Sequence, residues 1–243
     1  MKIADDNFCI KQGYIINSDA CTYEEDDSHE YWTAQRQSLA SEYQYDVYVE
    51  CAKWLLNHPS KSILEIGCGP AVKTAEFLVP FSKQIVLIDQ PSIREIATKN
   101  VPESEFYSVN LESPDFTSEI KFDLIMCADV IEHLHNPDPC LELIYEHLSD
   151  QGVVFLSTPE RDVRYYPGCN SSQHPAHIRE WNQPEFSTYI ESRRFDILRS
   201  ELVPPRKLSL LDKYLRFLFD RFYKTSRWHG CQMVVAKKSV KSS

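Results

Sequence analysis

The chain has 243 residues, of which 42% are hydrophobic, and this suits one large α/β domain or one domain with embellishments. Its formal net charge of -10 repels a nucleic-acid backbone on average, so we expect no nucleic-acid partner. No apolar stretch approaches the roughly 18 residues that span a bilayer, and the N-terminus shows no secretory leader. The eight cysteines form no C-x-x-C pair, which argues against a zinc site and for the reducing environment of the cytoplasm.

Helix and strand patterns follow a polar lead-in at 1–35, and we expect one domain over 36–243. Apolar residues at three- and four-residue steps predict a first helix over 36–57. Short runs of Ile, Val, Leu and Phe predict buried strands at 62–66, 84–88, 122–127 and 152–157. Helices are expected between them at 71–79, 91–99 and 138–148. This alternation predicts a parallel sheet with helices wound on both faces.

The last third of the chain is less regular. A long loop at 158–182 is of the kind that is usually functional or mobile. A helix near 183–193 and strands near 195–203 and 231–237 are expected to complete the sheet.

Between those two strands, an insertion at 205–228 carries a strongly apolar helix at 208–223. We expect this helix to pack in the core or to form the face of a homodimer. A cover for a lipid-like acceptor or a membrane surface is the alternative. Four flanking cations are too few for stable membrane anchoring; they are Lys213, Arg216, Arg221 and Lys224.

The segment ILEIGCGPAVKT at 63–74 brings Gly67, Cys68 and Gly69 to the end of the first predicted strand. In a parallel sheet this edge binds ligands, and glycines let ligand atoms approach the backbone. A dinucleotide site would prefer a third glycine where Val72 stands, and Glu65 would repel its diphosphate. Glu65 would instead attract a cationic ligand that carries no phosphate.

Asp89 ends the second predicted strand, 20 residues after Gly69. A carboxylate at this place is suited to accept hydrogen bonds from both hydroxyls of a ribose. The ligand is therefore expected to carry positive charge and a ribose and to lack phosphate. S-adenosylmethionine has these properties.

Four segments in order, LEIGCGPA, VLIDQ, FYSVNLES and the stretch from FDLIMCADVIEH to STPER, resemble class I S-adenosylmethionine-dependent methyltransferases. The resemblance covers roughly residues 45–200 and is closer to the small-molecule group that includes the ubiquinone-pathway O-methyltransferases. It implies a Rossmann-like, doubly wound, seven-stranded α/β sheet whose last strand is antiparallel. It also implies cofactor contacts at Glu65, Gly67, Cys68 and Gly69 (methionine), Asp89 (ribose), Gln90, Asn110 and Leu111 (adenine), and Cys127 and Ala128.

The segment ADVIEHLHNPD after the fourth predicted strand offers groups for chemistry. Asp129, Glu132 and His133 stand at i, i+3 and i+4, so one helical turn would bring them to a common face. They could hold a divalent ion that lowers the pKa of an acceptor hydroxyl, as the similar E-x-x-E-H arrangement of the ubiquinone-pathway enzymes implies. A general base at His133 without metal is an alternative, and so is a helix-capping acid with a locally packed histidine. A bound metal is not the favoured option of these.

The long loop contains a second polar group of residues. The sequence HPAHIREWNQPEF resembles an H-x-R-x-[WF] segment that runs along the acceptor side in relatives acting on sugars, lipids or secondary metabolites. His177 is the candidate base for a substrate hydroxyl, or else His177 and Arg179 only pin the loop. The group comprises Arg161, His174, His177, Arg179, Glu180 and Trp181.

Together these patterns favour a methyltransferase that methylates a hydroxyl of a small acceptor such as a sugar, a phenol or quinone, or a secondary metabolite. Transfer to nitrogen or carbon is the alternative within the same fold. A nicotinamide-dependent oxidoreductase is disfavoured by Glu65 and Val72. A binding module without turnover remains a further alternative.

Overall fold

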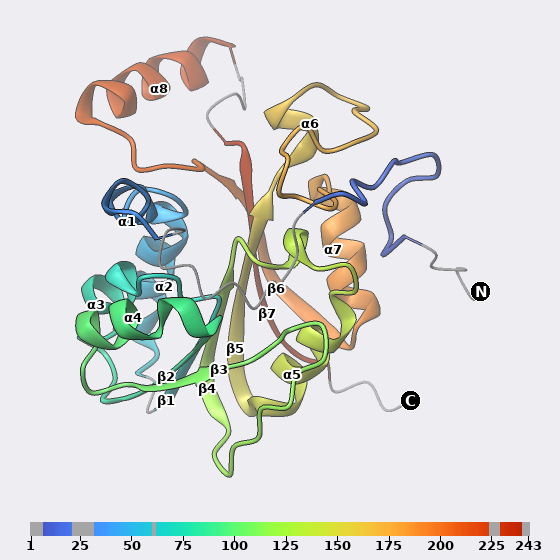
Figure 1. Ribbon diagram of the computed structural model, residues 1–243. Coiled ribbons are helices and arrows are strands. Elements are labelled where there is room, and N and C mark those ends of the chain that lie inside the picture. The colour runs from blue at the N-terminus through green and yellow to red at the C-terminus, as the bar shows by residue number, and fades with distance from the viewer. Residues whose placement is uncertain (1–6, 21–31, 60–61, 224–228, 240–243) are drawn as a thin grey trace.

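A seven-stranded sheet forms the centre of the protein in the computed structural model, which describes residues 7–20, 32–59, 62–223 and 229–239 (Figure 1). The strand order is β3-β2-β1-β4-β5-β7-β6. Strands β1 to β5 pair in parallel, whereas β7 is antiparallel to β5 and β6, so the predicted fold is confirmed. The strands are β1 (Ser62–Ile66), β2 (Gln84–Asp89), β3 (Glu105–Ser108), β4 (Phe122–Ala128), β5 (Leu148–Pro159), β6 (Phe195–Val203) and β7 (Cys231–Lys238).

Helices cover both faces of this sheet. On one face lie α2 (Tyr45–Asn57), α3 (Val72–Phe77), the short η1 (Pro91–Ile93) and α4 (Arg94–Asn100), and on the other lie α5 (Asp138–His147) and α7 (Gln183–Ser192) (Figure 1). Neighbouring residues of β1 point to opposite faces, and Ile63 and Leu64 enter different core clusters. Because both clusters exclude water, the central strands are continuous apolar runs.

The prediction of one continuous helix over 36–57 is wrong. The chain forms α1 (Ala34–Ala40) and α2, separated by a bend at Gln44, whose φ is +56°. At this bend the Gln44 N–H donates to the Pro205 carbonyl (3.0 Å), and the Lys207 N–H donates to the Glu42 carbonyl (2.8 Å). Contacts with a segment far along the chain therefore interrupt a pattern that is helical by periodicity.

Strand β5 begins at Leu148, earlier than the run predicted at 152–157, so Gly152 lies within the strand. A Cβ at Gly152 would lie 2.8 Å from the Phe122 carbonyl oxygen, so the glycine allows β4 and β5 to approach closely. The later elements lie close to their predicted bounds. The long loop contains only α6 (Arg161–Arg164), and α8 (Leu210–Tyr223) stands between β6 and β7.

Parts of the polar lead-in belong to the folded domain. Ile10 and Tyr14 are buried in the same core cluster as α7, and Trp181 donates its indole N–H to the Phe8 carbonyl (2.8 Å). Within the described ranges the seven cysteines are free thiols, and Cys21 and residues 224–228 lie outside those ranges. No helix among the described residues has both the length and the apolar character needed to cross a bilayer.

Candidate functional site

The turn after β1 depends on its two glycines. Gly67 has φ +72° and Gly69 has φ +52°, a left-handed conformation that side chains disfavour. A Cβ at Gly67 would lie only 2.2 Å from Cγ2 of Val130, and one at Gly69 would lie 3.2 Å from the Trp32 indole. The turn can therefore pass close to neighbouring groups only with glycine at the first position.

Asp89 lies at the end of β2, directly beside this turn. Its Oδ2 accepts the Gly69 N–H (2.6 Å), and its Oδ1 accepts the Gln90 N–H (2.7 Å). Burial raises the pKa of Asp89, and these two N–H donors oppose that rise. The residue remains partly exposed, and a carboxylate oxygen has more than one acceptor position. Asp89 can therefore still accept the hydroxyls of a ribose, so the predicted adenosyl ligand fits here.

Glu65 lies behind the turn and is only 1% exposed. Its carboxylate accepts the Tyr48 hydroxyl (2.5 Å) and the hydroxyl of Thr74. Burial raises the pKa of Glu65, whereas these two donors and the nearby charge of Lys73 act in the opposite direction. The side chain thus supports the turn from beneath, and its contact with a ligand stays a prediction.

The other predicted cofactor residues lie at the ends of four neighbouring strands, β3, β2, β1 and β4. Oδ1 of Asn110 accepts the Glu112 N–H (2.9 Å), and Leu111 beside it is buried. The hydrogen bond between Cys127 and Cys140 of α5, together with burial, raises the pKa of the Cys127 thiol. The Cys127 side chain therefore belongs to the core, and any cofactor contact would use its backbone. Three further predicted residues line these strand ends: Cys68, Gln90 and Ala128.

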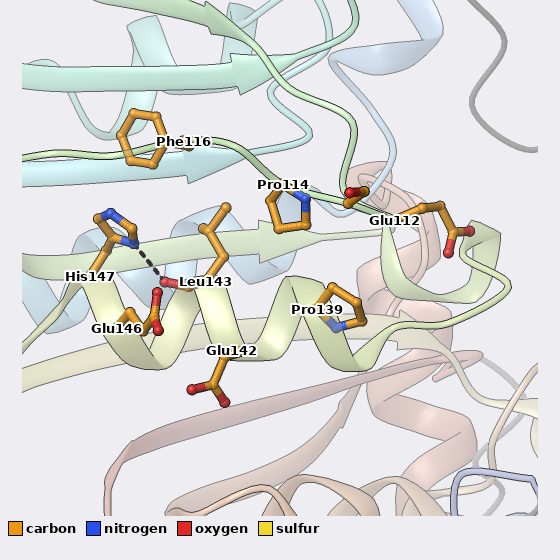
Figure 2. A pocket seen from close by; sticks show the side chains of 9 residues that line it. Glu112, Pro114, Phe116, Pro139, Glu142, Leu143, Glu146 and His147 are labelled. Atoms are coloured by element: carbon orange, nitrogen blue, oxygen red, sulfur yellow. Dashed lines mark hydrogen bonds between the residues drawn. The ribbon is translucent and has the colours of Figure 1, made fainter.

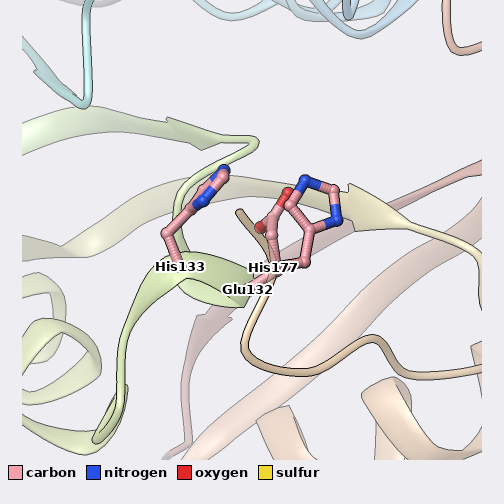
Figure 3. A group of neighbouring side chains, drawn as sticks. All are labelled: Glu132, His133 and His177. Carbon is pink, nitrogen blue, oxygen red and sulfur yellow. The ribbon is translucent and has the colours of Figure 1, made fainter. Parts of the chain in front are cut away.

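A second cluster forms where β4 ends. Asp129 has φ +61°, and only the single turn η2 (Ile131–His133) follows, so the predicted helical turn carrying Asp129, Glu132 and His133 is wrong. The ligand atoms of Glu132, His133 and His177 instead lie within 4.8 Å of one another (Figure 3). The Ile178 N–H donates to the Glu132 carbonyl (2.9 Å), which holds the loop against η2 and brings His177 into this cluster.

Hydrogen bonds fix both imidazole rings of the cluster. Nδ1 of His133 lies 2.7 Å from the Ala176 carbonyl, and Nδ1 of His177 is bonded to the Glu180 carboxylate. A carbonyl oxygen only accepts, so Nδ1 of His133 carries the proton, and the Glu180 carboxylate favours the same tautomer in His177. Burial and the neighbouring His177 lower the pKa of His133, which keeps that ring neutral. In both rings Nε2 is left to bind a cation or a proton.

Glu132 and Asp129 form a coupled pair of carboxyls. Burial and the Asp129 charge raise the pKa of Glu132 well above its usual range. Burial also raises the pKa of Asp129, but the hydrogen bond with Glu132 opposes this rise, and the net effect of the surroundings lowers the pKa. Oε2 of Glu132 accepts the Thr158 hydroxyl (3.1 Å), whereas Oε1 is buried with no hydrogen-bond partner among the described residues. An unpaired buried carboxylate oxygen beside two imidazoles suits a shared proton or a cation.

The loop that carries His177 is held by buried charges. Arg161 is fully buried and donates to Glu185 (2.7 Å), and Arg179 donates to the Leu134 carbonyl (2.6 Å) and to the His135 carbonyl (2.8 Å). These two arginines and the buried Trp181 therefore fix the loop and its attachment, rather than facing the cluster.

Glu180 and His174 support His177 directly. Oε1 of Glu180 also accepts the hydroxyls of Tyr165 and Ser172, each at 3.2 Å. The His174 ring stacks on His177 with centroids 3.9 Å apart. Burial and the neighbouring His177 lower the pKa of His174 to about 4.

Gln44 is a site residue that sequence reasoning missed. It is 5% exposed, donates to Oδ1 of Asp129 (3.1 Å) and accepts the Ser157 hydroxyl (2.9 Å). No sequence pattern singles it out, because its position depends on the bend between α1 and α2. Tyr48, Lys73 and Trp32, which surround the glycine turn, were also missed, because none of them belongs to a strand end or to the glycines themselves.

A pocket of about 350 Å³ lies away from both clusters, between α5 and the connection from β3 to β4 (Figure 2). Pro114 and Phe116 line it on one side, and Leu143 and His147 line it on the other. None of the predicted site residues lines this pocket. We therefore do not assign the cofactor or the acceptor to it.

Comparison with known proteins supports the same assignment of the fold. The "Methyltransferase domain" family model matches residues 31–199. A ubiquinone biosynthesis O-methyltransferase of Glaesserella parasuis is 27% identical over 115 residues, or 44% of this chain and 48% of that protein. A small RNA 2'-O-methyltransferase of Xenopus tropicalis is 30% identical over 95 residues, or 36% of this chain and 26% of that protein. The chain spans about half the length of most of the first curated relatives that it matches.

Among solved structures, a chain from the complex of the Haloferax volcanii Trm112 methyltransferase activator with a methyltransferase superposes with a TM-score of 0.65. The two chains are 12% identical, and the match covers 90% of this chain and 100% of the other. This likeness shows the fold. Given the family match over most of its length, the chain belongs to the methyltransferase domain family, within the class I S-adenosylmethionine-dependent methyltransferases.

Proposed function

We propose that the protein transfers the methyl group of S-adenosylmethionine to a hydroxyl oxygen of a small acceptor, assisted by a divalent cation held by Glu132, His133 and His177. The observation that carries this proposal is the approach of these three ligand groups to within 4.8 Å, next to the carboxyl ends of β4 and β5.

The chemistry of the cluster favours oxygen as the methyl acceptor. A hydroxyl must lose its proton as it attacks the methyl carbon, whereas a neutral amine is nucleophilic enough to attack first and lose its proton afterwards. The cluster supplies the imidazoles of His133 and His177 and a pair of coupled carboxyls, and groups of these kinds can accept or pass on that proton. The two curated relatives described above also carry O-methyltransferase in their names. Transfer to nitrogen or carbon remains the alternative.

On the cofactor side, residues of this chain would bind S-adenosylmethionine and orient it. Gly67 and Gly69 let the methionine portion approach the backbone, and Asp89 accepts the ribose hydroxyls. Methyl transfer is an in-line displacement, so its rate depends on holding acceptor and cofactor in a fixed alignment and on excluding water.

On the acceptor side, Glu132, His133 and His177 would hold the cation, and Gln44 fixes the Asp129 carboxylate beside them. A bound divalent cation would lower the pKa of an acceptor hydroxyl that it contacts. Asp129, whose pKa is lowered, remains ionised and would accept a hydrogen bond from the acceptor hydroxyl, whose proton then passes to solvent. Without a cation, the free Nε2 of His177 would be the base.

The acceptor class follows from charge. A net charge of -10 disfavours a nucleic-acid acceptor, in spite of the name of the Xenopus relative. We propose a small hydroxylated molecule, with phenols and quinols favoured over isolated alcohols because their hydroxyl pKa lies closer to neutral.

Turnover with methyl-labelled S-adenosylmethionine tests this function. The purified protein is incubated with a phenol, a catechol, a sugar and an amine, with and without EDTA, and the labelled products are identified. We expect an O-methylated product whose formation EDTA abolishes and added Mn²⁺ or Zn²⁺ restores. An N-methylated product would contradict the acceptor atom, and turnover indifferent to EDTA would contradict the cation.

Calorimetric titration with Mn²⁺ and Zn²⁺ tests the cation site separately. His177→Ala and Glu132→Gln should abolish binding, whereas His58→Ala, at an exposed position directly after α2, should keep it. A parallel titration with S-adenosylhomocysteine and NADH distinguishes this fold's cofactor from a nicotinamide. Saturable binding of NADH, with no binding of S-adenosylhomocysteine, would favour a nicotinamide-dependent oxidoreductase instead.

A further inference from the structure

Helix α8 exposes large apolar side chains, for which the sequence pattern predicts either packing in the core or the face of a homodimer. Leu210 is 87% exposed, Leu211 66%, Tyr214 60% and Phe217 61%. The expected packing in the core is therefore wrong for these four residues. In Figure 1, α8 lies at the top of the molecule, away from the sheet and the helices that cover it.

The exposed side chains share one face of the helix. Leu210, Tyr214 and Phe217 are spaced i, i+4 and i+7, so they lie in one row, and Leu211 flanks that row. Leu215 and Leu218 are partly buried on the adjacent side. An apolar row of this size on an isolated helix marks an interaction surface.

The charge of the insertion identifies the kind of partner. Residues 205–228 contain seven Lys and Arg and two Asp, a net charge of +5 in a chain whose total is -10. A second copy of the chain would bring the same positive segment against itself in a two-fold contact, which like charges oppose. An anionic lipid surface accepts both the apolar row and the positive charge.

The insertion also has a fixed relation to the site. β6 is parallel to β1–β5, so its carboxyl end leads into α8 at the same edge of the sheet as the two clusters. Residues 205–207 pair with the backbone at Glu42 and Gln44, and the Gln44 side chain donates to Asp129. A surface bound by α8 would therefore lie at the edge where the acceptor enters.

We propose that α8 is an interfacial helix that binds reversibly to anionic membranes, with Leu210, Leu211, Tyr214 and Phe217 inserted among the lipid headgroups. This binding is not an anchor, since one amphipathic helix holds a protein only weakly. It does not depend on which atom of the acceptor is methylated. It gives the enzyme access to acceptors that partition into a lipid surface.

Co-sedimentation of the full chain with vesicles tests the proposal. We compare vesicles of phosphatidylcholine alone with vesicles of equal parts phosphatidylcholine and phosphatidylglycerol. The wild-type protein should bind the anionic vesicles and release at high salt. The double variant Leu210→Ser and Phe217→Ser should bind at least about tenfold more weakly, because two apolar side chains no longer enter the lipid. Leu56→Ser is the matched control, because Leu56 is a 70% exposed leucine on α2 and its loss should change nothing.

Circular dichroism and the thermal midpoint check that the double variant is folded, and sedimentation equilibrium without lipid gives the oligomeric state. A monomer that binds anionic vesicles through these residues supports the proposal. Absence of vesicle binding, or equal binding by wild type and double variant, overturns it. A wild-type dimer that the double variant dissociates, with no vesicle binding, overturns it in favour of a homodimer face.

Discussion

The two halves of the proposed site are built differently. The cofactor half, around Gly67, Gly69 and Asp89, comes from two adjacent strands, and its polar atoms are paired with backbone N–H groups. The acceptor half, around Glu132, His133 and His177, joins the turn after β4 to a loop beyond β5. There Oε1 of Glu132 lacks a hydrogen-bond partner among the described residues.

This difference indicates that the first half would bind the cofactor and that the second half would take part in the transfer chemistry. Hydrogen bonds from backbone N–H groups hold the first half in one shape, which is suited to recognising a constant cofactor. The unpaired oxygen and the coupled carboxyls of the second half are free to take up a cation or a proton. Substitutions in the two halves should therefore affect different measurable quantities.

The largest effect is expected from His177→Ala. Removal of this imidazole takes away a ligand or a base, and turnover should fall by about 10²–10⁴-fold. The dissociation constant for S-adenosylhomocysteine should stay within about twofold, because the residue lies outside the cofactor half. Turnover is measured with the labelled cofactor and affinity by calorimetry, with His58→Ala as the control. If His177→Ala weakened the affinity for S-adenosylhomocysteine as strongly as it lowered turnover, the two halves would not be functionally distinct.

Asp89→Ala should produce the complementary result. The dissociation constant for S-adenosylhomocysteine should rise at least tenfold, or about 1.4 kcal/mol, because the ribose hydroxyls lose their acceptor. Asp89→Asn keeps one acceptor oxygen and should lose less. Mn²⁺ affinity should be unchanged in both variants. An unaltered cofactor affinity in Asp89→Ala would show that the ribose binds elsewhere.

The same contrast explains what the sequence could predict. The cofactor half follows from strand ends and a glycine turn, features that are local in the chain, so Gly67, Gly69 and Asp89 could be located by spacing alone. The acceptor half depends on how a loop without periodicity folds back. Helical spacing therefore grouped Asp129 with Glu132 and His133, although φ +61° at Asp129 breaks that turn and His177 completes the cluster. Gln44 escaped prediction because its bend depends on Pro205, far along the chain.

Glu180→Gln tests whether the acceptor half depends on its supporting residues. Glu180 accepts the Nδ1 proton of His177 and thereby presents Nε2, so it is a positioning residue. Its replacement should weaken Mn²⁺ binding by about tenfold and lower turnover to a similar extent. Cofactor affinity should not change. Glu146→Gln, on the exposed side of α5, is the matched control. Unchanged Mn²⁺ affinity would mean that Glu180 only pins the loop.

The smallest effect concerns acid, to which the two halves should respond with opposite sign. The pKa of His174 is lowered to about 4 from an ordinary value of 6.5, so between these values the unfolded chain binds more protons than the folded protein. Above pH 6.5 the ring is neutral in both states and does not affect stability. As the pH falls towards 4, protonation of the unfolded chain lowers the free energy of unfolding. The raised pKa values of Asp89 and Glu65 act in the other direction, because there the folded state holds its protons more tightly.

His174→Gln should therefore reduce the fall in the thermal midpoint between pH 7 and pH 5. The ring is only partly buried, and solvent screens the effect, so we expect a difference of roughly 2–4 °C, which corresponds to about 1 kcal/mol in a domain of this size. Differential scanning calorimetry at both pH values measures it, and His58→Gln, at the exposed position directly after α2, provides the control. An equal fall in the variant and the wild type would place the acid sensitivity outside the acceptor half, because His174 is the ring stacked directly on His177.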